Sequence, residues 1–490
     1  MKLASLAATS GIALAEAGDA EVTGFAIDHR KVAPGTVFGA FRGARVNGED
    51  FTPAAVEAGA VAVVARPEAP VKGAVHIADA EPRRAFARLA AAFFTPVPRV
   101  IVAVTGTNGK TSIVEMTRQL WRMGGEHSAS IGTLGVTTSD ESISTGFTTP
   151  DIVTFLSNMS GLACEGVTHV AYEASSHGLD QFRNEGVPVA AGAFTNFTRD
   201  HLDYHGTMEA YFAAKMRLFD EVLQPGSAAV IWHGEDDSEW TRRAIEHAHK
   251  RSLHVLTVGE QGEFIRLLAR TPTQLGQTLD IEHEGARHNI NLPLIGAYQV
   301  ANALVSCGLA IATGSPAGQV LDSANRLQPV RGRLERAAIT AKGAPIYVDY
   351  AHTPDAMEAA IAALRPHVEG RLITVFGAGG DRDKGKRAPM GAAAAAGSDV
   401  VIVTDDNPRG EEPSSIRASV LAEAPDAIEI GDRRTAIAEA IRMAGAQDIV
   451  LVAGKGHEQG QIIGSGESMR ILPFDDVQVA RECAGVEVTQ

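Results

Sequence analysis

The segment whose residue types best indicate chemistry is a glycine-bounded loop that follows an apolar run. It reads Gly-Thr-Asn-Gly-Lys-Thr-Ser over residues 106–112. Glycines let backbone N–H groups approach a phosphate closely, Lys110 can contact the outer phosphates, and Thr111 can ligate Mg²⁺. The spacing from Gly106 to Gly109 is shorter than in the standard phosphate-binding pattern. We still predict an ATP- or GTP-binding loop rather than a glycine turn with a solvated lysine, because a strand precedes the loop and a helix follows it.

Polar side chains also follow two further predicted strands. Glu173 ends the apolar segment 169–173, and His201 follows a strand predicted near Asn196. We expect both at the same edge of the sheet as the phosphate loop, where a carboxylate and an imidazole could coordinate a metal. The pattern therefore predicts a second Mg²⁺ site, although either side chain taken singly is more commonly a structural hydrogen-bonding group.

Lys215 lies on the apolar stripe of a predicted amphipathic helix. The stripe consists of Met208, Tyr211, Phe212, Leu218, Phe219 and Val222. Because burying an ammonium group is costly, an inward lysine must be paired, neutralised or modified. A neutral amine can react with CO₂ to give a carbamate, which inverts the charge and makes a metal ligand. The commoner alternative is a lysine that extends its amine past the edge of the core into water.

Charged loops also occur in the last third of the chain. Arg382, Arg409 and Glu458 could together bind a zwitterion, since arginine binds carboxylates through two hydrogen bonds and glutamate accepts from an ammonium group. This combination predicts an amino-acid substrate. The alternative is that these loops are simply solvated.

The elements that must position these residues form three blocks. We predict an α/β fold with a small N-terminal α/β domain (residues 1–98), a central P-loop domain with a parallel sheet (residues 99–328) and a C-terminal Rossmann-like domain (residues 329–490). In the central block, strands are expected to end at Thr105 and near Glu173, Asn196 and Ile231. In the last block they are expected at Ile346–Asp349, Leu372–Phe376, Val400–Thr404 and Ile449–Ala453.

Composition limits the classes of function. A net charge of -15 argues against a general nucleic-acid binder. Cys164, Cys307 and Cys483 are few, separated and odd in number, so neither a disulfide framework nor a zinc site is expected, and a reducing cytosol is favoured. Residues 1–18 look like the opening of the first domain rather than a secretory leader. No apolar run approaches the roughly 18 residues needed to span a bilayer.

Several motifs occur together in an order that is highly specific. By these motifs the chain resembles the Mur ligases over essentially its whole length. These enzymes form amide bonds with ATP in peptidoglycan precursor synthesis. The motifs are Gly-Thr-Asn-Gly-Lys-Thr from 106, Thr-Thr-Pro from 148, Glu-Ala-Ser-Ser-His from 173, Asp-His-Leu-Asp-Tyr-His-Gly from 200, Tyr-Phe-Ala-Ala-Lys from 211, Asp-Tyr-Ala-His-Thr-Pro-Asp from 349 and Asp-Asn-Pro-Arg from 406.

The resemblance implies roles for individual residues. Those near the chemistry are Lys110, Glu173, His201 and Lys215, and the Mg²⁺ ligands are Thr111, Glu173, His201 and a carbamylated Lys215. ATP is bound by Gly106, Thr107, Asn108, Gly109, Lys110, Thr111, Ser112, Asn302, Arg333 and His352. The UDP-muramoyl dipeptide is bound by His29, Thr148, Thr149, Ser175, Gln181 and Arg183. Diaminopimelate is bound by Arg382, Asp406, Asn407, Pro408, Arg409, Gly454 and Glu458.

The activity implied is that of the family branch adding meso-diaminopimelate to the D-Glu γ-carboxylate of UDP-N-acetylmuramoyl-L-Ala-D-Glu through an acyl phosphate. Arg409 is the argument for this amino acid, because lysine lacks the second carboxylate that a guanidinium would pair with. The same resemblance implies ATP and Mg²⁺ as cofactors, small-molecule substrates only, a cytoplasmic location and a monomer without nucleic-acid or membrane partners. Closure of the third domain over the others is expected to exclude water from the acyl phosphate.

Some positions depart from the family pattern, and other functions remain open. His29 replaces a serine expected to contact uridine, Gln299 replaces an asparagine, and Asn47-Gly-Glu49 replaces an Asp-Gly pair. The alternatives are the same ligase acting with L-lysine or another diamino acid, and a ligase like folylpolyglutamate synthetase, which should lack the Asp-Asn-Pro-Arg loop. A P-loop ATPase without an amino-acid requirement, or an inactive binding module, explains fewer of the motifs.

Overall fold

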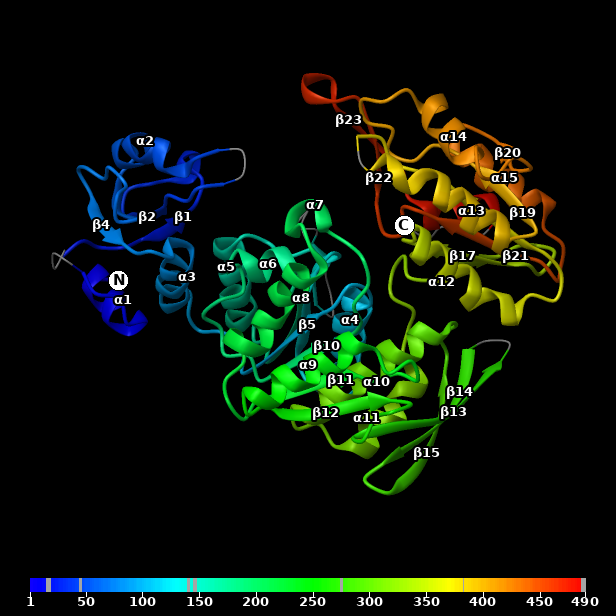
Figure 1. Cartoon of the computed structure of the whole chain (residues 1–490), viewed down its shortest axis with the longest axis horizontal. Coiled ribbons are helices and arrows are strands. Elements are labelled where there is room, and N and C mark those ends of the chain that lie inside the picture. Colours follow the sequence, from blue (N-terminus) through cyan, green and yellow to red (C-terminus); the bar gives the residue numbers. More distant parts are fainter. Residues whose placement is uncertain are drawn as a thin grey trace. The chain divides into compact units, whose positions relative to one another are not determined.

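The chain divides into two compact units, each containing α/β structure (Figure 1). The computed structural model describes residues 1–14, 19–43, 46–138, 142–143, 148–273, 276–381 and 383–485. The first unit comprises Met1–Arg266 and Leu304–Val320, and the second comprises Leu267–Ala303 and Leu321–Gln490.

The N-terminal part of the first unit is a four-stranded parallel sheet with helices. Its strands are adjacent in chain order: β1 (Gly24–Ala26), β2 (Thr36–Gly39), β3 (Ala60–Ala65) and β4 (Val75–Ala78). The helices are α1 (Leu3–Ser10), α2 (Thr52–Glu57) and α3 (Pro82–Phe93). Strand β3 is apolar throughout because it is largely buried.

A larger parallel sheet forms the centre of the first unit. Its strands β12-β11-β10-β5-β9-β6 run parallel in this order, and two short antiparallel strands follow at the β6 edge. The strands are β5 (Val100–Thr105), β6 (Ser128–Gly132), β7 (Gly135–Thr137), β8 (Ser142–Ile143), β9 (His169–Glu173), β10 (Ala191–Phe194), β11 (Ala228–Trp232) and β12 (His254–Gly259). Because β5 lies between β10 and β9, the loops that follow these three strands emerge side by side.

The helices of this central part connect the parallel strands. They are α4 (Lys110–Met123), α5 (Ile152–Cys164), α6 (Ser176–Asp180), α7 (Leu202–His205), α8 (Met208–Arg217) and α9 (Glu239–Lys250). The amphipathic helix expected over residues 208–222 is confirmed up to Arg217, and its last part, Leu218–Val222, is a π-helical turn. The apolar stripe continues through this turn, since Leu218 and Phe219 are fully buried.

The second unit begins within a strand and contains a sheet of its own. Its first part holds β13 (Ile265–Thr273), β14 (Gly276–His283), β15 (Ala286–Leu292), α10 (Ala297–Ala312) and α11 (Ala317–Ser323), with the unit boundaries falling inside β13, α10 and α11. The later sheet has the order β16-β17-β21-β18-β19-β20, in which β16 alone is antiparallel to its neighbour. Its strands are β16 (Glu335–Ile339), β17 (Pro345–Asp349), β18 (Leu372–Phe376), β19 (Val400–Val403), β20 (Ile428–Glu429) and β21 (Ile449–Ala453).

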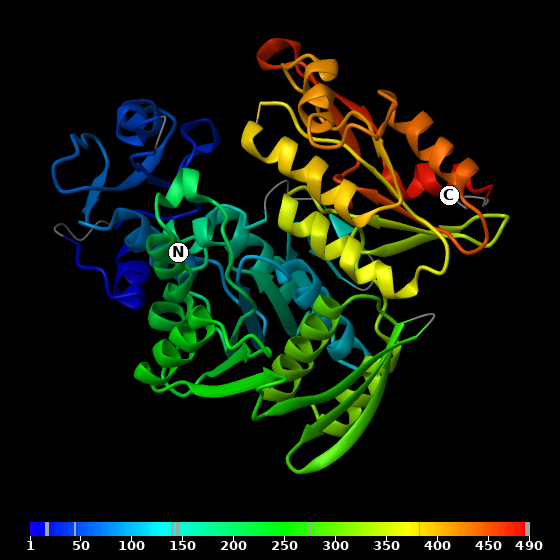
Figure 2. The ribbon, with the colours of Figure 1, turned by 45° about the vertical axis from the view of Figure 1, so that its right-hand side comes forward.

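Helices cover both faces of this C-terminal sheet (Figures 1 and 2). Leu451 faces the core shared with α12 and α13, and its neighbours Val450 and Val452 face the core shared with α15 and α16. The helices are α12 (Pro354–Leu364), α13 (Arg387–Gly397), α14 (Pro413–Leu421), α15 (Arg433–Met443) and α16 (Asp476–Cys483), and a hairpin is formed by β22 (Gly460–Ile463) and β23 (Arg470–Pro473). All four strands expected in this block are confirmed, since a strand covered on both faces must be apolar at successive positions.

All three cysteines are free thiols, and Cys307 is buried. Within the described ranges, no helix has the length and apolar character required to cross a membrane.

Candidate active site

The phosphate loop connects β5 to α4 in a conformation that requires glycine. Gly106 has a φ of 140°, and a Cβ at this position would lie 1.9 Å from Oγ1 of Thr195. Gly109, with a φ of 88°, is the N-cap residue directly before α4. The helix therefore starts at Lys110 and directs its free N–H groups toward the loop, which is the arrangement that binds phosphate.

The segment after β10 holds this loop in place. The N–H of Asn108 donates to Oδ1 of Asn196 at 2.9 Å, and Oγ1 of Thr195 donates to the Asn108 carbonyl at 2.6 Å. Oγ1 of Thr107 donates to the Thr198 carbonyl at 3.2 Å. Sequence reasoning did not assign a role to Thr195 or Asn196. Their position directly after a predicted strand was the signal that could have identified them.

Two lysines converge on the loop. Nζ of Lys110 donates to the carbonyls of Gly106 and Thr107 at 2.9 and 2.7 Å, and Nζ of Lys215 donates to the same Gly106 carbonyl at 2.7 Å. Lys215 is 1% exposed, so the alternative of a lysine extending into water is wrong. Burial, reinforced by the charge of Lys110, lowers the pKa of Lys215 well below its ordinary value. This shift favours the neutral, nucleophilic form of the amine.

Glu173 ends a strand, whereas His201 directly precedes a helix. Glu173 is the last residue of β9, as predicted; it is buried, and its Oε1 accepts the N–H of Thr133 at 2.7 Å. His201 does not end a strand, because β10 stops at Phe194 and His201 directly precedes α7 with a φ of 50°. Partial desolvation lowers the pKa of His201 against the opposing charge of Asp200, which favours the neutral imidazole. A neutral imidazole can act as a ligand.

The side chains near the loop include oxygen donors of the kind that a hard cation prefers. Among the residues that the structure describes, no group of three or more His, Cys, Asp or Glu side chains is arranged to hold a metal. Thr111 and Glu173 supply buried oxygen atoms, and His201 supplies a neutral nitrogen. A carbamate on Lys215 would add two anionic oxygen atoms, and oxygen ligands are those that Mg²⁺ prefers.

Four predicted dipeptide-binding residues form one hydrogen-bonded network. Oγ1 of Thr149 lies 2.9 Å from both the Glu173 carbonyl and Oγ of Ser175. Nη1 of Arg183 donates to the Thr149 carbonyl at 2.9 Å, and Nη2 donates to Oε1 of Gln181 at 2.7 Å. The network therefore joins the predicted substrate residues to the backbone of the predicted metal ligand Glu173.

Tyr204 extends this network and was not assigned a role from the sequence. Nε2 of Gln181 donates to the Tyr204 hydroxyl at 3.0 Å, and this hydroxyl donates to Oδ2 of Asp180 at 2.7 Å. The amide of Gln181 is thus oriented from one side by Arg183 and from the other by Tyr204. Tyr204 lies in α7, three residues after the predicted metal ligand His201, which directly precedes this helix.

The other two predicted dipeptide residues, Thr148 and His29, contact different neighbours. Oγ1 of Thr148 accepts from Oγ1 of Thr133 at 3.1 Å, next to the Thr133 N–H that contacts Glu173. His29 lies in the N-terminal part of the unit, where its ring stacks on Phe51 with centroids 4.4 Å apart and an interplanar angle of 9°. Among the described residues, no hydrogen bond joins His29 to the network of Gln181 and Arg183.

The nucleotide residues predicted in the second unit also form a group. Nδ2 of Asn302 donates to Oε1 of Gln299 at 3.1 Å, and Nε2 of Gln299 donates to the carbonyl of Arg333 at 3.1 Å. The guanidinium of Arg333 stacks over the ring of Tyr350 at 4.5 Å, and Nδ1 of His352 lies 2.8 Å from the Tyr350 carbonyl. Gln299, a departure from the family pattern, therefore connects two of the predicted residues.

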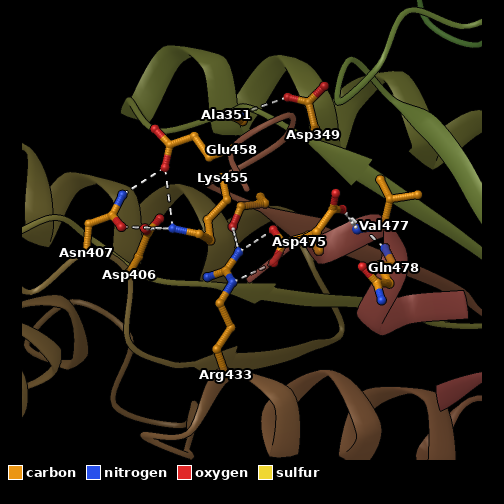
Figure 3. Close-up of polar contacts among 12 residues, drawn as sticks. Asp349, Ala351, Asp406, Asn407, Arg433, Lys455, Glu458, Asp475, Val477 and Gln478 are labelled. Atoms are coloured by element: carbon orange, nitrogen blue, oxygen red, sulfur yellow. Dashed lines mark hydrogen bonds and ion pairs between the residues drawn. The ribbon is translucent and has the colours of Figure 1, made fainter. Parts of the chain in front are cut away.

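The predicted diaminopimelate residues gather at the ends of β19 and β21 (Figure 3). Nδ2 of Asn407 donates to Oε2 of Glu458 at 2.8 Å, and Nη1 of Arg409 donates to the Gly380 carbonyl at 2.9 Å. Asn407, Arg409 and Gly454 have φ values of 42°, 51° and 115°, so the two loops are tightly bent. Asp406 is buried, and Pro408 lies between Asn407 and Arg409. Arg382 lies outside the described residues.

Known proteins resemble this chain over its whole length. Three family models match it: "Mur ligase family, catalytic domain" at residues 21–98, "Mur ligase middle domain" at residues 104–310 and "Mur ligase, glutamate ligase domain" at residues 332–456. A relative from Zymomonas mobilis, named UDP-N-acetylmuramoyl-L-alanyl-D-glutamate--2,6-diaminopimelate ligase, is 59% identical over 98% of both chains. The chain belongs to the Mur ligase family.

Solved structures agree with this assignment to the Mur ligases. A structure of a UDP-N-acetylmuramoyl-L-alanyl-D-glutamate--2,6-diaminopimelate ligase is 32% identical and covers 99% of both chains with a TM-score of 0.73. The fold is also shared with the MurF ligase from Thermotoga maritima, solved in complex with ADP, at 21% identity and a TM-score of 0.61 over 89% of this chain and 95% of that one. The predicted three-domain α/β architecture is thereby confirmed.

Proposed function

We propose that this Mur ligase uses ATP to add meso-diaminopimelate to the D-Glu γ-carboxylate of UDP-N-acetylmuramoyl-L-Ala-D-Glu in peptidoglycan precursor synthesis. The observation that carries the proposal is the 59% identity, over 98% of both chains, to a relative bearing the name of this ligase. The loops described above support it, because the phosphate loop, the inward lysine and the Asp-Asn-Pro-Arg segment are all present and structured.

The reaction has two chemical steps. The γ-phosphoryl group of ATP passes to the D-Glu γ-carboxylate, which gives an acyl phosphate and ADP. The amine of diaminopimelate then attacks the acyl carbon, and the tetrahedral intermediate collapses to an amide and inorganic phosphate. In our proposal the N–H groups from Gly106 to Ser112 bind the phosphates, and Lys110 offsets the negative charge that accumulates during transfer.

Lys215 is proposed to act as a carbamate. Its neutral amine attacks the carbon of CO₂, an N–C bond forms, and a proton leaves to solvent. The burial that lowers its pKa supports this step, because a protonated amine has no lone pair for the attack. Together with Thr111, Glu173 and His201 the carbamate would hold Mg²⁺, which when bound offsets phosphate charge and orients the reacting oxygen atoms.

We assign one group of residues to each of the three substrates. Thr148, Thr149, Ser175, Gln181 and Arg183 bind the muramoyl dipeptide, with His29 toward the uridine part. Asn302, Arg333 and His352 bind the nucleotide. The second carboxylate of diaminopimelate pairs with the Arg409 guanidinium, assisted by Arg382, Asp406, Asn407, Pro408, Gly454 and Glu458. A lysine substrate would leave that guanidinium without its carboxylate partner, which supports selectivity for diaminopimelate.

We also propose the domain limits, the location and the oligomeric state of the protein. The domain limits are residues 1–98, 99–328 and 329–490, and the protein acts as a cytoplasmic monomer on small molecules, without nucleic acid or membrane partners. Closure of the C-terminal domain is proposed to protect the acyl phosphate from water.

The test is phosphate release with ATP, Mg²⁺ and UDP-N-acetylmuramoyl-L-Ala-D-Glu, with meso-diaminopimelate, L-lysine or no amino acid supplied in parallel. We expect release and a tripeptide product only with diaminopimelate. Equal use of lysine would retain the ligase and remove the role given to Arg409. Release that needs neither the dipeptide nor an amino acid would instead identify a simple ATPase.

A further inference from the structure

A fully buried lysine lies behind the predicted amino-acid loops. Lys455 follows β21, and its side chain is 0% exposed. Its Nζ lies 2.9 Å from Oδ1 of Asn407, 3.3 Å from Oδ1 of Asp406 and 3.4 Å from Oε2 of Glu458 (Figure 3). A buried ammonium group needs such partners, because desolvation is costly unless the charge is paired and hydrogen-bonded. All three partners belong to the predicted diaminopimelate site.

The two carboxylate oxygen atoms of Glu458 differ in their contacts. Oε2 accepts from Nδ2 of Asn407 at 2.8 Å and pairs with Lys455. Within the part of the chain that the structure describes, Oε1 takes part in no hydrogen bond or ion pair, and the side chain is 33% exposed. One edge of the carboxylate is therefore fixed, and the other oxygen is left to accept from a ligand in a set direction.

The orientation of Asn407 depends on the same lysine. Its Oδ1 accepts from Nζ of Lys455 and from the N–H of Ile462, both at 2.9 Å. Two donors on the oxygen force the amide nitrogen to face Glu458, since an amide carries its acceptor and donors on opposite sides. Lys455 therefore holds Glu458 both directly and through Asn407.

Charge favours a cationic ligand at this position. Lys455 neutralises one of the two carboxylates of Asp406 and Glu458, which leaves one negative charge in the cluster. The nearby Arg433 is engaged by Asp476, with Nε and Nη2 at 2.8 and 2.7 Å from its two oxygen atoms. A single remaining carboxylate charge matches an ammonium group of an amino acid.

We propose that Lys455 is a positioning residue of the amino-acid site, which fixes Glu458 so that Oε1 accepts from an ammonium group of the incoming substrate. This inference rests on the function proposed above. Lys455 does not contact the substrate, and it acts through Asn407 and Glu458.

The experiment compares KM values for three substrates in the full-length enzyme. Lys455→Met keeps an unbranched side chain of similar length and removes the charge, and Lys342→Met, at an exposed position of the same unit, is the matched control. We expect KM for diaminopimelate to rise about tenfold or more in Lys455→Met, because a charge-assisted hydrogen bond loses its geometry. KM for ATP and for the UDP-dipeptide should stay within about twofold of wild type.

A second variant separates positioning from folding. Lys455→Met leaves two carboxylates without their cation, so Asp406→Asn is added to it and compared with Asp406→Asn alone. We expect the double variant to recover thermal stability while its KM for diaminopimelate stays about tenfold above that of Asp406→Asn. Restoration of KM together with stability, or an equal rise in all three KM values, would overturn the positioning role. If the wild-type enzyme forms no product with diaminopimelate, the proposed function itself is overturned.

Discussion

Lys110 and Lys215 donate hydrogen bonds to one shared acceptor, the backbone carbonyl of Gly106, at 2.9 and 2.7 Å. The two lysines come from α4 and α8. Burial of Lys215, together with the nearby charge of Lys110, lowers the pKa of Lys215 well below its ordinary value. In the proposed mechanism Lys215 forms the carbamate and Lys110 contacts the phosphates of ATP.

Replacing Lys215 by alanine should remove most activity. We expect the rate of phosphate release to fall by more than about a hundredfold, because the proposed metal ligand is lost. Short carboxylic acids such as acetate should partly restore it by occupying the space of the carbamate. The control is Lys250→Ala, a lysine 73% exposed on α9. Near-normal turnover of Lys215→Ala would rule out the carbamate.

Replacing Tyr204 by phenylalanine should weaken binding of the UDP-dipeptide. The change removes the hydroxyl that orients Gln181 and contacts Asp180, while the ring is kept. We expect KM for the UDP-dipeptide to rise about five- to tenfold, the effect of one or two lost hydrogen bonds, with KM for ATP unchanged. Steady-state kinetics with each substrate varied in turn measure both values. A KM for the UDP-dipeptide equal to that of wild type would show that Gln181 is held without Tyr204.

Replacing Arg409 by alanine should reduce selectivity for the amino acid. We expect kcat/KM for diaminopimelate to fall about a hundredfold and the preference over L-lysine to narrow, since the partner of the second carboxylate is removed. Arg442→Ala is the control, because that side chain is 72% exposed. Competition assays with both amino acids measure the preference. A parallel loss of ATP affinity would instead indicate damage to the fold.

His457 should make the protein sensitive to acid. Burial, with the charges of Arg333, Arg331 and His352 adding to it, lowers the pKa of His457 to about 3. An unfolded chain has the ordinary pKa of about 6.5, so the unfolded state binds the additional proton between these values and stability falls as the pH drops from about 6.5 toward 3.

The measurement for His457 is thermal unfolding as a function of pH. Wild type should lose stability through this group by at most about 1.4 kcal/mol for each pH unit, and His457→Gln should lack that contribution. The midpoint difference, wild type minus variant, should therefore shrink as the pH is lowered from 7.5 to 4.5. A midpoint difference that does not change with pH would mean that His457 has the same pKa in the folded and unfolded states.

The sequence by itself determined the local elements and the family. The apolar run before Gly106, the strands of the C-terminal block and the stripe around Lys215 were predicted correctly, because burial on one or both faces leaves a periodic pattern within a few residues. The order of the motifs identified a Mur ligase, which the comparisons confirmed.

The tertiary structure decided which distant groups meet. Lys215 reaches the Gly106 carbonyl across 109 residues, Tyr204 orients Gln181, and Lys455 fixes Glu458 through Asn407. His201 follows an irregular segment rather than a strand, so no periodicity could have located it. Such contacts depend on strand order and on the packing of whole layers. These are set by burial across the entire chain, and local propensity does not encode them.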